Sequence, residues 1–118
     1  MRITEVSYEY GLPIKGYGVG FFRIGSDIKW GNLFTFNKEI HSWCGFNDAN
    51  LIINAHSEID VLLVGTGVKL SEIPTTFRNS IEAAGVNVEI MSTPIACRTY
   101  NVLLGEGRRI GAALLAIQ

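Results

Sequence analysis

Cys97 is the residue that its surroundings best suit to act as a nucleophile. It lies three positions after Pro94, in the first turn of a predicted helix, where backbone N–H groups and the helix dipole favour a thiolate. The neighbouring Arg98 would lower the thiol pKa further. A nucleophilic cysteine also needs a base, and the sequence places neither His41 nor His56 near it. A buried core thiol is therefore the simpler interpretation, with a thiol-dependent enzyme as the alternative.

A second candidate for chemistry is the run Gly65-Thr66-Gly67, which follows four apolar residues, 61–64. Open α/β sheets usually bind ligands at the carboxyl ends of their strands, so a phosphate or nucleotide site is one interpretation. However, no third glycine follows at dinucleotide-binding spacing, and the next predicted helix begins only near Pro74. A tight turn with one glycine at positive φ is the simpler interpretation.

The third candidate is a polar group along the same predicted helix, comprising Arg98, Asn101, Glu106, Arg108 and Arg109. Cations near a helix C-terminus complement the dipole, and Glu106 could pair with either neighbouring arginine. Arginine is also enriched in interfaces and forks well onto carboxylates and phosphates. We therefore treat these residues, with Gly65 and Gly67, as a candidate binding surface.

The N-terminal third of the chain is rich in β-forming residues. Ile3 to Tyr8 and the residues around Ile14 are short extended pieces broken by glycine and proline, which predicts a draped segment. Residues 17–24 and 28–37 each predict one strand, separated by a turn at 25–27. Residues 38–46 predict a hairpin arm or an irregular excursion, in which Trp43 is either an interface aromatic or a plug at the core edge.

The remaining residues alternate between helical and strand patterns. The first predicted helix lies within Asp48 to Glu58, with Asn47 or Asp48 as its N-cap, and a strand follows at Val61 to Val64. The second helix runs from Pro74 to Gly85 and is followed by a strand at Val86 to Met91. The third helix has Thr93 as its N-cap and Pro94 as its first residue, ends at about Gly105, and is followed by a strand at Arg109 to Ile117. This alternation is typical of α/β domains with right-handed crossovers between parallel strands.

Composition narrows the class of protein. The 118 residues fit a single domain, 1–118, with 47% apolar residues, a net charge of −1 and a pI of about 6.1. That balance argues against sequence-independent nucleic-acid binding, and no apolar run approaches the roughly 20 residues that span a bilayer. Cys44 and Cys97 have no metal-ligand spacing, so we expect no metal and no cofactor. The N-terminus resembles neither a secretory signal nor a transit peptide, and we expect a cytoplasmic protein.

Several motifs together resemble one small α/β family of unknown function. They are Tyr17-Gly18, Phe22-Arg23, residues 60–67 (DVLLVGTG), 88–91 (VEIM) with Thr93, 96–103 (ACRTYNVL), 106–109 (EGRR) and 112–115 (AALL). The family's eukaryotic relatives include a mitochondrial assembly factor for respiratory complex I and an adipogenesis-associated protein. The resemblance covers residues 15–117 and implies a three-layer α/β fold. Its mixed sheet would have about five strands, the last antiparallel to the others, with a β-hairpin extension.

The resemblance implies little about chemistry, because no reaction is known for the family. Its assembly-factor members act by binding other proteins, which implies a non-enzymatic interaction factor for NADH dehydrogenase, cytoplasmic in a prokaryote and mitochondrial in the eukaryotic relatives. The motif positions carried over are Cys97, Arg98, Asn101, Glu106, Arg108, Gly65 and Gly67. This sequence departs from the family pattern at Ser92, where an acidic residue is expected, and at Gly105, which should loosen the helix end by up to about 1 kcal/mol relative to alanine.

The sequence is therefore compatible with three functions: a protein-binding assembly factor, an enzyme using Cys97 beside Arg98, and a phosphate or nucleotide binder at residues 65–67. We favour the assembly factor, because Cys97 has no paired base and the glycine run is an incomplete phosphate loop. A homodimer is left open.

Overall fold

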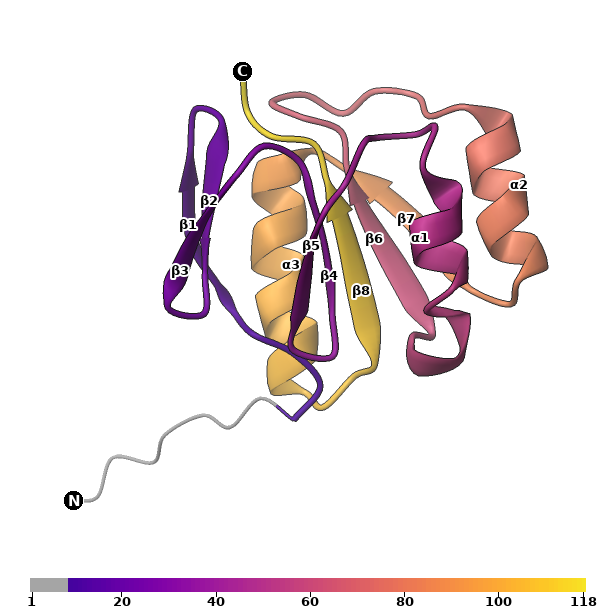
Figure 1. Ribbon diagram of the computed structural model, residues 1–118, viewed down its shortest axis with the longest axis horizontal. Coiled ribbons are helices and arrows are strands. Elements are labelled where there is room, and N and C mark those ends of the chain that lie inside the picture. The colour runs from indigo at the N-terminus through magenta and orange to yellow at the C-terminus, as the bar shows by residue number, and fades with distance from the viewer. Residues whose placement is uncertain (1–8) are drawn as a thin grey trace.

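The computed structural model describes residues 9–118, so the predicted extended piece at Ile3 to Tyr8 lies outside the described residues. Two sheets form the framework (Figure 1). The first, called the small sheet below, is antiparallel and contains β1 (Ile14–Gly18), β2 (Phe21–Ile24) and β3 (Asp27–Trp30). The main sheet has the order β5-β4-β8-β6-β7 and contains β4 (Leu33–Phe36), β5 (Glu39–Ser42), β6 (Val61–Gly65), β7 (Asn87–Met91) and β8 (Ile110–Leu114).

Helices and the small sheet cover the two faces of the main sheet. On one face lie α1 (Ala49–Ile53), a 3-10 turn (His56–Glu58) and α2 (Thr75–Ala83); on the other lie α3 (Thr93–Gly105) and the small sheet (Figure 1). Each face has its own apolar cluster, which is why β6 and β8 are apolar at nearly every position. The predicted three-layer α/β fold, the mixed sheet of five strands and the β extension are confirmed.

The direction of the last strand differs from the prediction. β8 runs parallel to β6 and antiparallel to β4, so β4 rather than the last strand runs against the others. The reason lies in the connections. α2 links β6 to β7 in one direction, whereas α3 carries the chain back across β6 to β8. Right-handed crossovers in opposite directions place α2 and α3 on opposite faces and start all three strands at the same end.

The N-terminal strands are divided differently from the prediction. Residues 17–24 contain the end of β1, a turn at Val19-Gly20 and all of β2, because Gly20 takes φ +79°. Residues 28–37 are likewise cut at Gly31, with φ +83°, and supply strands to two different sheets. Ile14 belongs to a paired strand rather than to a draped segment. Glycine tolerates positive φ, so here it turns the chain inside an unbroken β-forming pattern.

Trp43 is a core residue. Its side chain is 3% exposed and packs against Phe46 and Phe77, with ring centroids 5.6 and 5.9 Å away. Its indole N–H donates to the carbonyl of Asp48 at 3.2 Å. Of the two roles predicted for Trp43, the structure shows the one in which its side chain fills the edge of the core.

Candidate functional site

The loop after β6 is tied to the start of α3 by Thr93. The Thr93 hydroxyl accepts a hydrogen bond from the Gly67 N–H at 2.8 Å and donates to the carbonyl of Leu115 at 2.8 Å. The Thr93 N–H in turn donates to the Gly67 carbonyl at 2.7 Å. Thr93 was predicted to cap its own helix, but Ser92 occupies the N-cap position and Thr93 joins three segments instead. We call Gly65, Gly67 and Thr93 the α3 junction.

Gly65 and Gly67 serve this junction for different reasons. A Cβ atom at Gly65 would lie 2.8 Å from the Thr93 hydroxyl and 2.9 Å from a methyl of Leu114, so only glycine fits. Gly67 takes φ +97°, which favours glycine and turns the loop back towards α3. The predicted tight turn is confirmed.

The same loop has little capacity left to bind a phosphate. The N–H groups of Thr66, Gly67 and Ser71 donate to the Met91 carbonyl, the Thr93 hydroxyl and the Thr66 hydroxyl, respectively. A phosphate cradle needs such N–H groups free and pointing at the ligand. Here the protein itself occupies them, so the structure gives the nucleotide alternative no support.

Cys97 lies inside the core between α3 and the main sheet, where its side chain is buried. Burial raises the pKa of the Cys97 thiol to about 12, and the nearby positive charge of Arg98 lowers it by less. The thiol is therefore neutral near pH 7, whereas nucleophilic attack needs the thiolate. The position near a helix N-terminus favours the thiolate, but this effect on the Cys97 pKa does not outweigh the effect of burying the thiol away from solvent.

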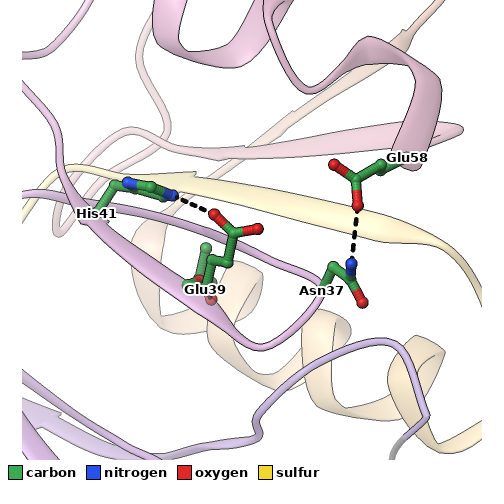
Figure 2. A network of polar contacts seen from close by, with 5 residues as sticks. Asn37, Glu39, His41 and Glu58 are labelled. Atoms are coloured by element: carbon green, nitrogen blue, oxygen red, sulfur yellow. Dashed lines mark hydrogen bonds and ion pairs between the residues drawn. The ribbon is translucent and has the colours of Figure 1, made fainter.

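Neither histidine is placed to act as a base for Cys97. His41 stacks on Phe34 and Phe36, and His56 follows α1, so both lie on the opposite face of the main sheet from Cys97. His41 instead meets Glu39 on the surface, 2.9 Å away (Figure 2). The structure gives the thiol-enzyme alternative no support.

Asn101 holds the small sheet to α3. Its side-chain oxygen accepts from the Ile14 N–H at 2.8 Å, and its side-chain amide donates to the Ile14 carbonyl at 2.7 Å. The amide thus pairs with the backbone of β1 as a neighbouring strand would. Because both of its polar ends are used inside the chain, Asn101 positions an element and is not free for a partner.

The charged run at the end of α3 also has structural tasks. Gly107, at φ +78°, ends the helix: its N–H donates to Leu104 and the N–H of Arg108 donates to Leu103, which is the Schellman arrangement. The guanidinium of Arg109 donates to the carbonyls of Ser57 and Glu58, the second at 3.3 Å.

Arg109 also borders a shallow pocket of 270 Å³, together with Tyr10, Asn37, Ser57 and Glu58. Two of these lining residues bond to each other: the Asn37 side-chain amide donates to the Glu58 carboxylate at 2.8 Å, a contact drawn in Figure 2. Glu106 was predicted to pair with a neighbouring arginine, but within residues 9–118 it forms no ion pair with Arg108 or Arg109.

One face of α3 remains available to a partner. The buried positions of α3 are Thr93, Ala96, Cys97, Tyr100 and Leu104. The opposite face carries Ile95, Arg98 and Val102, in which Ile95 is 48% and Val102 59% exposed. These three residues are three and four positions apart, so they lie on one stripe of the helix. We call Ile95, Arg98 and Val102 the α3 outer stripe.

The structure therefore separates the predicted site residues. Gly65 and Gly67 lie at the N-terminal end of α3, and Glu106, Arg108 and Arg109 at its C-terminal end, about 20 Å apart for a 13-residue helix. Sequence analysis missed Ile95, Val102 and the exposed Trp30. The helical spacing of Ile95 and Val102 around Arg98 could have identified the first two.

The described part of the chain contains neither a metal-binding cluster nor a membrane-spanning helix. Across residues 9–118, histidine, cysteine and carboxylate side chains nowhere gather in threes around a potential metal position. No helix in the same range has the length and apolar character needed to cross a bilayer.

Comparison with known proteins finds one matching family and several similar chains. The family model described as "Protein of unknown function (DUF498/DUF598)" matches residues 14–115. An uncharacterised protein of Rhodobacter capsulatus is 43% identical over 98% of this chain and 93% of its own length. The NADH dehydrogenase [ubiquinone] 1 alpha subcomplex assembly factor 3 of Drosophila melanogaster is 32% identical over 98% of this chain, which spans 64% of that factor's length.

A solved structure is similar over nearly the whole chain. The crystal structure of an outer membrane protein from Bartonella henselae has a TM-score of 0.84 and 31% identity, and the match covers 95% of this chain and all of the other.

Proposed function

We propose that this chain, which belongs to the DUF498/DUF598 family, is a non-enzymatic assembly factor. In this proposal it binds a protein partner through the α3 outer stripe. An assembly factor for NADH dehydrogenase is 32% identical to this chain, and the partner proposed here is a subunit or another assembly factor of that enzyme. The proposal rests on this likeness for the kind of partner and on the geometry of α3 for the surface.

The observation that carries the choice of surface is the apolar character of a helix face exposed to solvent. A helix packed on a sheet normally presents polar and charged residues to water. Here two β-branched aliphatic residues, Ile95 and Val102, flank Arg98 instead. Arginine between apolar contacts is typical of interface centres, where its guanidinium can fork onto a carboxylate.

The arrangement of the other charged residues supports the same surface. The side chain of Arg109 and both ends of the Asn101 amide are used within the chain. Arg98 is exposed, and among the described residues it has no hydrogen bond or ion pair through its side chain. Arg108 and Glu106 are also exposed, and Arg108 is included in the test as the edge of this surface.

The test is a site-directed crosslinking experiment. A photoreactive amino acid is placed at Val102, and captured proteins are identified by mass spectrometry from cells that contain NADH dehydrogenase. We expect subunits or assembly factors of NADH dehydrogenase among the crosslinked products. We also expect Arg98→Glu to reduce that capture at least about tenfold, because the reversed charge repels an acidic partner.

The matched control is Lys38→Glu, which reverses an exposed charge in the turn between β4 and β5. Arg108→Glu reports how far the surface extends along α3. Capture that is equal for wild type and Arg98→Glu would remove the α3 outer stripe from the proposal. Capture of proteins unrelated to NADH dehydrogenase would remove the assembly role. The cytoplasmic location and the homodimer stay predictions.

A further inference from the structure

The small sheet has one face packed on α3 and one that nothing in the described chain covers. Phe22 and Ile24 point inward and are fully buried. The strand register places two rows of residues on the other face, Gly18-Phe21-Trp30 and Gly16-Arg23-Ile28, each crossing β1, β2 and β3. We call these two rows the outer face of the small sheet.

The first row carries two aromatic side chains, Phe21 and Trp30. The Phe21 ring lies over Gly18, where a Cβ atom would be 2.5 Å away, so glycine makes room for the ring. Phe21 also packs against Trp30, with ring centroids 5.2 Å apart. Trp30 is 68% exposed, and Val19 continues the apolar surface at the adjoining turn. The outward face of an antiparallel sheet in water is normally polar, so an aromatic row here is anomalous.

The second row adds one cation, Arg23, beside an apolar side chain, and Lys15 lies next to this row in the chain. The stem of Arg23 crosses Gly16, at 3.9 Å from its Cβ position, and Ile28 on β3 is 56% exposed. Arg23, Lys15 and Ile28 line a small pocket of 200 Å³, together with Gly25, Ser26 and Asp27. Arg23 and Lys15 bring two cations to this pocket and Asp27 brings one anion, a local excess of one positive charge in a chain whose net charge is −1. Lys29 belongs to the inner row, beside Phe22, and its ammonium donates to the Ser42 hydroxyl.

We propose that the outer face of the small sheet docks onto an anionic phospholipid surface, with Trp30, Phe21 and Ile28 entering the interfacial region and the pocket beside Arg23 and Lys15 taking a lipid phosphate. Tryptophan prefers the membrane interface, because its ring is apolar and its N–H remains near water. Cations beside it attract anionic headgroups. This inference does not depend on the proposed function, which uses a different surface.

Charge also argues against a second copy of this chain as the occupant. Two copies stacked through this face would each present the same cations, Arg23 and Lys15, to the other, and like charges oppose such an interface. A lipid surface offers the opposite charge and a flat apolar layer, which matches a face formed by two rows on a sheet.

Intrinsic tryptophan fluorescence of the full chain tests the inference. The chain has two tryptophans, and since Trp43 is buried, a change in emission on adding vesicles reports mainly on Trp30. We expect phosphatidylglycerol vesicles to shift the emission to the blue, and lipids with brominated chains to quench it. Phosphatidylcholine vesicles should do neither. Raising the salt concentration should weaken the shift, because it screens charge attraction.

Variants separate this role from a structural one. Trp30→Ser should abolish the shift and reduce co-sedimentation with phosphatidylglycerol vesicles, and Arg23→Glu should weaken binding at least about tenfold. Lys38→Glu is the matched control, and we expect it to bind as wild type does. Circular dichroism checks that each variant is folded.

Several outcomes would overturn the inference. They are the absence of a shift with phosphatidylglycerol, an equal shift with phosphatidylcholine, or Arg23→Glu binding as well as the control. Competition by soluble glycerol phosphate at the same phosphate concentration would assign the pocket to a free phosphate compound instead. A dimer in light scattering that Trp30→Ser dissociates, without any response to vesicles, would assign the face to a second copy.

Discussion

The α3 junction lies at the start of α3 and the α3 outer stripe lies along it, and the two regions differ in whether their polar groups have partners within the chain. At the junction, the hydroxyl and N–H of Thr93 all have partners within the chain, and Gly65 leaves no space for another atom. On the outer stripe, Ile95 and Val102 expose about half of their surface or more, and Arg98 faces water between them.

This contrast separates two reasons for which a residue can stand out in a sequence. A residue whose polar groups are all used internally contributes to the stability of the fold. An exposed apolar or charged residue that forms no hydrogen bond or ion pair within the chain contributes much less to stability. Its side chain is free to bind a partner. Substitutions at the junction should therefore lower stability, whereas substitutions on the stripe should leave it unchanged.

The largest effect is expected for Thr93→Val, which keeps the shape of the side chain and removes its hydroxyl. The Gly67 N–H and the Leu115 carbonyl would both lose a partner in a buried place, at a cost of about 1–3 kcal/mol each, so we expect unfolding to become easier by about 3 kcal/mol. Urea denaturation measures it. Thr93→Ser keeps the hydroxyl and should lose less than half as much; equal losses would mean that packing, not hydrogen bonding, holds the junction.

A somewhat smaller effect is expected for Gly65→Ala. Its methyl group would lie 2.8 Å from the Thr93 hydroxyl and 3.0 Å from the Thr93 backbone, so we expect a loss of about 2 kcal/mol from overpacking. The control is Gly105→Ala at the last residue of α3, where no atom lies within 4 Å of the added Cβ. That variant should gain up to about 1 kcal/mol in the same urea measurement. A neutral Gly65→Ala would show that the junction can relax.

Cys97 provides a test of burial through its pH dependence. Its pKa is raised from 9.0 to about 12 in the folded chain, so above pH 9 the unfolded chain loses the thiol proton while the folded chain keeps it. The contribution of this group to stability is therefore fully present below pH 9 and falls with rising pH, by up to about 1.4 kcal/mol per pH unit.

The measurement compares this fall in a Cys44→Ser background with and without Cys97→Ala. The background is needed because Cys44 is exposed. The decline above pH 9 should be steeper when Cys97 is present. In the same background, iodoacetamide should modify Cys97 only as fast as the chain unfolds. Fast alkylation near pH 7 would show an accessible thiolate and would restore the thiol-enzyme alternative.

The smallest effect on stability is expected for Arg98→Glu, which should change the free energy of unfolding by less than about 0.5 kcal/mol. Among the described residues the Arg98 side chain has no hydrogen bond or ion pair, so its replacement removes none from the fold. Thermal unfolding of this variant beside Lys38→Glu checks it. A loss as large as that of Thr93→Val would place Arg98 with the junction and remove it from the proposed partner surface.

The sequence alone determined the alternation of elements from residue 48 onward, because each element carries its own pattern. The apolar run at 61–64 is bounded by breakers, and Gly85 follows the second helix at φ +92°. Such local patterns report the type of an element and which side is buried. Motifs spread between Tyr17 and residue 115 also placed the chain in its family, whose model matches residues 14–115.

The tertiary structure decided what each candidate residue does, because those roles depend on segments far apart in the chain. Asn101 meets Ile14, which is 87 positions away, and Thr93 meets Gly67, which is 26 positions away. No local pattern contains such partners. The direction of β8 likewise follows from the path of α3 across the sheet, and the burial of Cys97 follows from what packs around it. Spacing in the sequence can identify a polar residue; only its neighbours in space show whether its polar groups are used within the chain or left for a partner.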